Sequence, residues 1–277
     1  MKDILIYTEN FQDWSPAVSY AAGLAATLDA MLTGIYVFAS PMASMPPYDA
    51  PGVMANLLET IRELENDAFA AGDSFVARAN QSGARRAAWQ VATGYLPGVL
   101  ERIGNWQDLL VIERTTNASS GSTTAVSHIV LTAGLPCITL PPNYEEGFSL
   151  DCLVLAWNGS VEAVRAIHTA LPLILHAKRV VLLQGELRPE FDINQIGWRP
   201  EFDISRYLRK HGVEFELQAL AKGGHEAGRA LLDAASKHGA DLLVMGAWGR
   251  TRFSEWMLGG ATHHVLNHAD IPVLMRH

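Results

Sequence analysis

The chain has 277 residues, enough for two domains of ordinary size, and its content of 49% hydrophobic and 18% charged residues is typical of a globular protein with complete cores. The net charge of −8 argues against a nucleic-acid or anionic-membrane surface, because phosphate-rich partners recruit clustered Lys and Arg. No apolar stretch reaches the roughly 18 residues of a membrane span, and no signal-peptide pattern precedes the first strand-like run. We therefore expect a cytoplasmic protein without nucleic-acid or membrane partners, although a small phosphorylated ligand stays open.

The two cysteines, Cys137 and Cys152, lie in strand-like runs and have neither CxxC nor zinc-like spacing. We interpret them as small buried hydrophobic residues in a reducing compartment.

The first half of the chain alternates between apolar runs and helical stretches. Ile4 to Tyr7 is typical of a buried strand, and Ser15-Pro16 supplies a helix N-cap with proline at the first helical position. Further strands are expected at 34–38, 89–92, 109–112 and 137–140, and helices at 16–31, 54–81, 96–103 and 125–132. This order implies right-handed crossovers and a parallel sheet covered on both faces.

The second half repeats this order after a linker at 141–147. Strands are expected at 152–156, 179–183, 213–219, 242–245 and 273–275, and helices at 161–176, 202–210, 226–237 and after Gly260. Asp108-Leu109-Leu110-Val111 recurs as Asp241-Leu242-Leu243-Val244, which indicates an internal repeat. The predicted fold class is α/β, with two tandem Rossmann-like domains at 1–146 and 147–277, each an open, mostly parallel five-stranded sheet with helices on both faces.

Glycines follow the strand at 242–245. Gly246 and Gly249 end that strand, and Gly259 and Gly260 precede the last helix. Glycines at a strand-to-helix corner let backbone N–H groups approach an anion near the positive end of the helix dipole. The pattern therefore fits a phosphate site, and equally a set of tight corners without a ligand.

In its order of elements and glycine spacing the chain resembles the universal stress protein family, in a tandem form with two copies of the domain. Nucleotide-binding members carry a glycine, two residues, a glycine, nine residues, a glycine and then serine or threonine. Gly246, Gly249 and Gly259 match the three glycines, whereas Gly260 stands at the hydroxyl position. Losing one hydrogen bond to a charged group, worth about 1.5 to 3 kcal/mol, would lower affinity about tenfold or more.

The resemblance implies an adenine nucleotide, ATP or AMP with magnesium, bound in the second domain. Asn158 stands near the family's adenine-facing aspartate, Thr262 is a partial substitute for the missing hydroxyl, and Arg250 either neutralises phosphate or is solvated. The site residues implied are Asn158, Gly185, Gly246, Gly249, Arg250, Gly259, Gly260 and Thr262.

The first domain departs further from the signature. Glu113 replaces the first glycine, and the loop at 114–122 lacks the spaced glycine pair. A carboxylate there would repel an anion, so we expect a degenerate nucleotide loop even though Asp13 matches the family's acidic position. Its Ser/Thr-rich loop could hold a smaller ligand.

Other chemistry finds little support in the sequence. His263, His264 and His268 lie near one another, but no further ligand is spaced so as to complete a zinc site. We therefore assign neither a metal site nor a catalytic residue. Two alternatives to a protein that binds a nucleotide without efficient turnover stay open. One is a structural or interaction protein with a vestigial glycine loop, and the other is a weak ATPase.

The tandem resemblance also implies an intramolecular pseudo-dimer, formed commonly through the last strand of each domain. Here these strands are 137–140 and 273–275. A further homodimer is an open possibility.

Overall fold

The computed structural model describes residues 1–38, 51–114, 123–185, 203–220, 226–247 and 260–277. The chain forms two compact units. Unit 1 comprises Met1–Leu135 and Pro142–Phe148, and unit 2 comprises Pro136–Pro141 and Ser149–His277.

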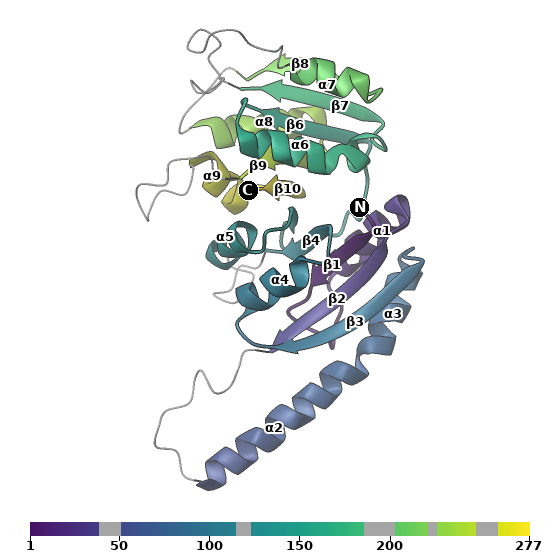
Figure 1. Ribbon diagram of the computed structural model, residues 1–277, viewed down its shortest axis with the longest axis vertical. Helices are drawn as coiled ribbons and strands as arrows, with labels where there is room; N and C mark the ends of the chain where they lie inside the picture. The colour runs from purple at the N-terminus through teal and green to yellow at the C-terminus, as the bar shows by residue number, and fades with distance from the viewer. Residues whose placement is uncertain (39–50, 115–122, 186–202, 221–225, 248–259) are drawn as a thin grey trace. The chain divides into compact units, whose positions relative to one another are not determined.

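Unit 1 is built on four parallel strands in the order β3-β2-β1-β4 (Figure 1). Their bounds are β1 (Asp3–Tyr7), β2 (Met31–Phe38), β3 (Arg86–Thr93) and β4 (Leu109–Glu113). The described helices are α1 (Pro16–Leu28), α2 (Pro51–Ala70), α3 (Gly72–Gln81), α4 (Leu96–Gly104) and α5 (Thr123–Thr132). Because α1 packs beside α3 and α4 beside α5, helix pairs cover the two faces of the sheet.

Unit 2 has the strand order β5-β10-β9-β6-β7-β8. The strands are β5 (Cys137–Leu140), β6 (Cys152–Trp157), β7 (Arg179–Gln184), β8 (Glu216–Ala219), β9 (Leu242–Gly246) and β10 (Val273–Arg276). The described helices are α6 (Val161–Ile174), α7 (Ile204–Lys210), α8 (Ala227–His238) and α9 (Gly260–His268). All these strand pairs are parallel except β5 with β10.

The α/β class with an open, mostly parallel sheet is confirmed. The pairing of the two last strands is confirmed as well, with Leu274 opposite Ile138 in an antiparallel register. This pairing places β5 within unit 2, so the ten strands described divide four and six between the units instead of five and five. Antiparallel pairing covers one side of β10, which would otherwise be an open edge.

The helix expected at 54–81 is wrong as a single element, because α2 ends at Ala70 and α3 begins at Gly72. The indole Nε1–H of Trp89 donates to the carbonyl oxygen of Ala68 at 2.7 Å. In a continuous helix that carbonyl would accept from the N–H of Gly72. A long-range contact from β3 therefore takes the place of one helical hydrogen bond and divides the helix.

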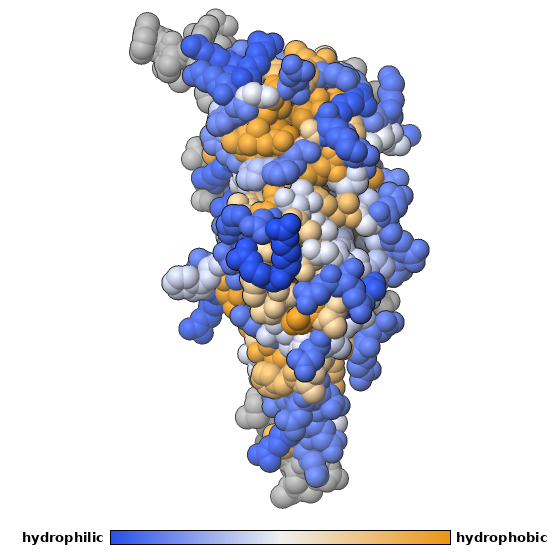
Figure 2. Space-filling view, turned by 90° about the vertical axis from the view of Figure 1, so that its right-hand side faces the viewer, coloured by the Kyte–Doolittle hydropathy of each residue, from blue (hydrophilic) through white to orange (hydrophobic). Residues whose placement is uncertain are grey.

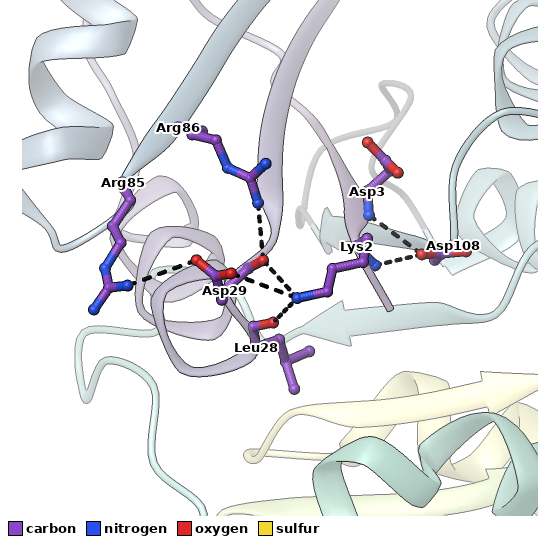
Figure 3. A network of polar contacts seen from close by, with 7 residues as sticks. All are labelled: Lys2, Asp3, Leu28, Asp29, Arg85, Arg86 and Asp108. Carbon is purple, nitrogen blue, oxygen red and sulfur yellow. Dashed lines mark hydrogen bonds and ion pairs between the residues drawn. The ribbon is translucent and has the colours of Figure 1, made fainter.

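Helix α1 ends earlier than expected, at Leu28, and β2 begins at Met31. Asp29 adopts a left-handed conformation with φ 48°, and its N–H caps the carbonyls of Ala25 and Ala26. The Lys2 ammonium donates to the carbonyls of Leu28 and Asp29 (Figure 3). The end of this helix is thus set by αL capping and by the first strand.

The repeated aspartate has the same structural role in both units. In unit 1 a carboxylate oxygen of Asp108 accepts the backbone N–H groups of Lys2 and Asp3 (Figure 3). In unit 2 a carboxylate oxygen of Asp241 accepts the N–H of Cys152 at 2.7 Å. The return bonds run from the aspartate N–H groups to the carbonyls of Asp3 and Cys152, both at 2.8 Å. Each aspartate therefore clamps the start of one central strand to its neighbour.

The cysteines are buried free thiols, as expected. Burial raises the pKa of both Cys137 and Cys152, which keeps them protonated and poorly nucleophilic.

Asp241→Asn should destabilise unit 2, because the charged acceptor of the Cys152 N–H is lost. Hydrogen bonds to charged groups are worth about 1.5 to 3 kcal/mol, so a loss of about 1 to 3 kcal/mol is expected in urea unfolding. Asp233→Asn is the matched control, since its ion pair with Arg229 is largely exposed and contributes little. Equal effects of the two substitutions would contradict the clamp.

Candidate functional site

The strand order of unit 2 reverses between β6 and β9. From β6 the chain proceeds through β7 to β8 on one side, and then returns to place β9 on the other side. In open α/β sheets, ligands bind outside the carboxyl ends of the strands at this switch point. The residues that follow β6, β7 and β9 are therefore the candidate site.

The turn after β6 is held by its own side chains. The Asn158 Oδ1 accepts the N–H of Ser160 at 3.1 Å, and the Ser160 Oγ accepts the N–H of Ala163 at 3.2 Å. Gly159 between them has φ +77°, a conformation that favours glycine. Ser160 thus caps α6 with its side chain, whereas Ser15, the N-cap expected from the sequence, precedes α1 without a side-chain bond. This turn uses the Asn158 carbonyl oxygen and leaves its amide NH2 as a donor.

Gly185, directly after β7, lies beside Asn158. Its N–H donates to the Trp157 carbonyl at 2.8 Å. A Cβ placed on Gly185 would lie 3.9 Å from the Asn158 Cβ and 3.5 Å from the Trp157 oxygen. The structure thus brings these two predicted site residues together, with ordinary room for a small side chain at Gly185.

Gly246, at the end of β9, packs against the first turn of α6. A Cβ on Gly246 would lie 2.5 Å from the Ala163 nitrogen and 2.6 Å from the Glu162 carbonyl carbon. Backbone atoms cannot move aside cheaply, so this position requires glycine whether or not a ligand binds. A side chain at Gly246 would therefore collide with the backbone of α6.

Glu162 is a buried carboxylate beside Gly246 that the glycine pattern did not reveal. It lies in the first turn of α6, where a negative charge is favourable. The negative charge of Glu162 therefore already complements the N-terminus of α6. This favours the N-terminus of α9 over that of α6 as the place for a phosphate. The sequence signal that could have revealed Glu162 was an acidic residue two positions after Ser160, in the first turn of the expected helix.

Two predicted site residues lie on α9. Gly260 is its first residue and is exposed, whereas Thr262 is only 4% exposed. Burial of Thr262 favours a structural role for its side chain over phosphate contact. Gly249, Arg250 and Gly259 lie outside the described residues.

Helix α9 packs closely on α8. A Cβ on Gly228 would lie 2.7 Å from the His264 Cβ and 2.8 Å from the Ala261 carbonyl oxygen. The rings of His264 and His268 stack with centroids 4.2 Å apart. Burial lowers the pKa of His264, and nearby His268 and Arg229 lower it further. In the described ranges no group of three potential metal ligands gathers, on this helix or elsewhere.

The equivalent edge of unit 1 is occupied by its own side chains. The Glu113 Oε1 accepts the N–H of Asn143 at 2.7 Å, so the carboxylate that replaces the first glycine holds the following chain in place. Arg114, the next residue, is 6% exposed. The loop at 115–122 lies outside the described residues.

Aromatic rings fill the same region of unit 1. The rings of Phe11 and Tyr36 pack edge-to-face with their centroids 4.8 Å apart. The rings of Tyr36 and Phe38 do the same, also with a centroid distance of 4.8 Å. Phe11 and Phe38 form a buried cluster with Ala68. The Glu113 carboxylate and these aromatic rings therefore occupy the edge of unit 1 that corresponds to the candidate site.

Comparisons with known proteins point to one family. Residues 201–277 match the model of the universal stress protein family. A universal stress protein of Synechocystis sp. is 23% identical over 99% of this chain and 99% of its own length. The resemblance to the universal stress protein family is confirmed.

Solved universal stress proteins share the fold of the whole chain. One from Archaeoglobus fulgidus has a TM-score of 0.67 at 13% identity, covering 99% of this chain and 96% of its own. A putative one from Pseudomonas aeruginosa has a TM-score of 0.56 at 14% identity, covering 100% of this chain and 93% of its own. Among the helices described here, none has the length and apolar character needed to cross a membrane.

Gly246→Ala should destabilise unit 2 by about 1 to 3 kcal/mol, as overpacking of a rigid contact does. Gly185→Ala is the matched control and should fold as the wild type, because its Cβ has ordinary contacts. Urea unfolding measures both. Equal stability of the two variants would contradict the packing argument.

Acid should loosen α9. Because the folded-state pKa of His264 is lowered, folding favours its neutral form, and this stabilisation is complete above the unfolded value of about 6.5. It is lost as pH falls below that value. The melting temperature should therefore drop between about pH 7 and 5, and His264→Gln should flatten that drop. His263→Gln, on the exposed side of α9, is the control; an unchanged slope for His264→Gln would refute the assignment.

Proposed function

We propose that this protein is a stress-response protein that holds an adenine nucleotide, ATP or AMP with magnesium, in its second domain, 147–277. The observation that carries the proposal is that Asn158, Gly185 and Gly246 at the end of β9 lie at the switch point of unit 2. The family resemblance supports the same site, since the matched residues 201–277 include Gly246, Gly249, Gly259 and Gly260.

The adenine end of this site lies between Asn158 and Gly185. The Asn158 amide offers a donor to a base edge, and the absence of a side chain at Gly185 leaves space beside it. An asparagine can exchange hydrogen bonds with a base in place of the family's aspartate.

The phosphate end lies toward Gly260, where α9 begins. The exposed backbone N–H groups of a helix start attract anions, and magnesium would offset the remaining phosphate charge. We assign no general base, so we propose binding without efficient turnover.

The direct test is mass spectrometry of the gently purified protein, together with melting in millimolar ATP and magnesium. We expect a bound adenine nucleotide, or a raised melting temperature. A ligand at 100 times its Kd stabilises the folded state by about 2.7 kcal/mol. If the wild type contains no bound nucleotide and shows no thermal shift, the proposal is refuted. That result would favour an interaction protein with a vestigial glycine loop.

Two substitutions test the site itself. Gly260→Ser restores the missing hydroxyl and should tighten nucleotide binding about tenfold, since one hydrogen bond to a charged group is worth about 1.5 to 3 kcal/mol. Gly185→Leu should abolish binding by filling the space beside Asn158 while the protein stays folded.

The matched control is Gly98→Leu on α4 of unit 1, where no atom lies within 4 Å of the added Cβ. Calorimetric titration measures all three variants. Nucleotide binding that is unaffected by Gly185→Leu would place the site elsewhere.

A further inference from the structure

Helix α2 carries a ridge of apolar and charged residues, of which Leu58, Arg62 and Phe69 are exposed and Glu65 is partly exposed. Leu58, Arg62, Glu65 and Phe69 follow one another at intervals of four, three and four residues, which places them on one line along the helix. We call these four residues the α2 ridge. Leu58 is 44% and Phe69 is 63% exposed, although both are large and apolar.

Helix α2 is anchored at its C-terminal end. Ala68 is fully buried, and its carbonyl accepts the Trp89 indole N–H. From there α2 extends away from the sheet of its own unit (Figure 1). Figure 2 shows hydrophobic surface among hydrophilic surface toward the bottom, where α2 lies.

The charges of the α2 ridge are arranged symmetrically. Arg62 and Glu65 lie between the two apolar residues, and in the described part of the chain no ion pair involves either of them. Of the remaining acidic residues of this segment, Glu63 and Asp67 fall on the opposite side of the helix at about 100° per residue, whereas Glu59 lies three residues before Arg62, at the edge of the ridge.

We propose that the α2 ridge is a docking surface for α2 of a second copy of this chain, in an antiparallel pair. A twofold axis between residues 63 and 64 sets Leu58 opposite Phe69 of the second copy and Arg62 opposite Glu65. Every position then meets a complementary one, and the same contacts occur twice, as an isologous interface requires.

Other arrangements lack this complementarity. A parallel pair in register would set Arg62 against Arg62 and Glu65 against Glu65. An anionic lipid surface is disfavoured, because the segment 58–70 carries one basic residue, Arg62, and the four acidic residues Glu59, Glu63, Glu65 and Asp67.

The contact is small. From Leu58 to Phe69 the helix rises about 16 Å, well below the extent of a standard interface of about 800 Å² per partner. The dimer should therefore be weak, with a Kd in the micromolar range or above, and should weaken with salt because ion pairs orient it.

Sedimentation velocity of the full chain over a concentration series tests the proposal. The wild type should associate reversibly. Arg62→Glu or Glu65→Arg alone should weaken association about tenfold or more, because each turns two attractive contacts into two repulsive ones. The double variant R62E/E65R should restore it. Glu63→Arg is the matched control, because it makes the same charge change as Glu65→Arg on the far side of the helix.

Cysteine cross-linking tests the orientation. A mixture of Leu58→Cys and Phe69→Cys chains should form disulfide-linked dimers under mild oxidation, and either variant alone should not. A wild type that stays monomeric at high concentration would overturn the proposal. So would association that the single charge reversals leave unchanged, or that the double variant fails to restore.

Discussion

The contact between Gly246 and the first turn of α6 is the constraint on which the candidate site depends. A missing Cβ lets the end of β9 approach the backbone at Glu162 and Ala163. This approach brings the carboxyl ends of β6 and β9 together at the place where the strand order reverses. The turn of Asn158 and Ser160, which starts α6, is held in the same place. Gly246 matches a nucleotide-binding motif, but the packing of β9 against α6 requires a glycine at this position whether or not a ligand binds.

The two units share one structural contact and differ at the edge where the candidate site lies. Both retain the aspartate clamp at the start of the central strands, because it stabilises the sheet and does not depend on a ligand. They differ at the opposite edge. In unit 1 Glu113 binds the backbone of Asn143, and aromatic rings fill the region around Phe11 and Phe38. In unit 2 Gly246 stands at the position of Glu113, and Gly185 follows β7. The aspartate clamp and the candidate site therefore lie at opposite ends of the same strands.

Long-range contacts decide several element boundaries. Trp89 on β3 takes the Ala68 carbonyl and thereby separates α2 from α3. That break lets α3 return to the sheet while α2 continues outward with Leu58 and Phe69 exposed. The same anchor therefore explains both the broken helix and the availability of the α2 ridge.

The sequence by itself determined the α/β class, most elements and the repeat, because apolar periodicity and glycine or proline boundaries are local signals. The pairing of the two last strands was implied by the family resemblance. The sequence also pointed to Asn158 and Gly185 through the family resemblance. Only the tertiary structure showed that these two residues are neighbours and that Gly246 faces backbone. It also showed that Thr262 is buried and that β5 groups with unit 2. Each of these depends on which segments, distant in the chain, are brought within a few ångströms, and no local pattern encodes that distance.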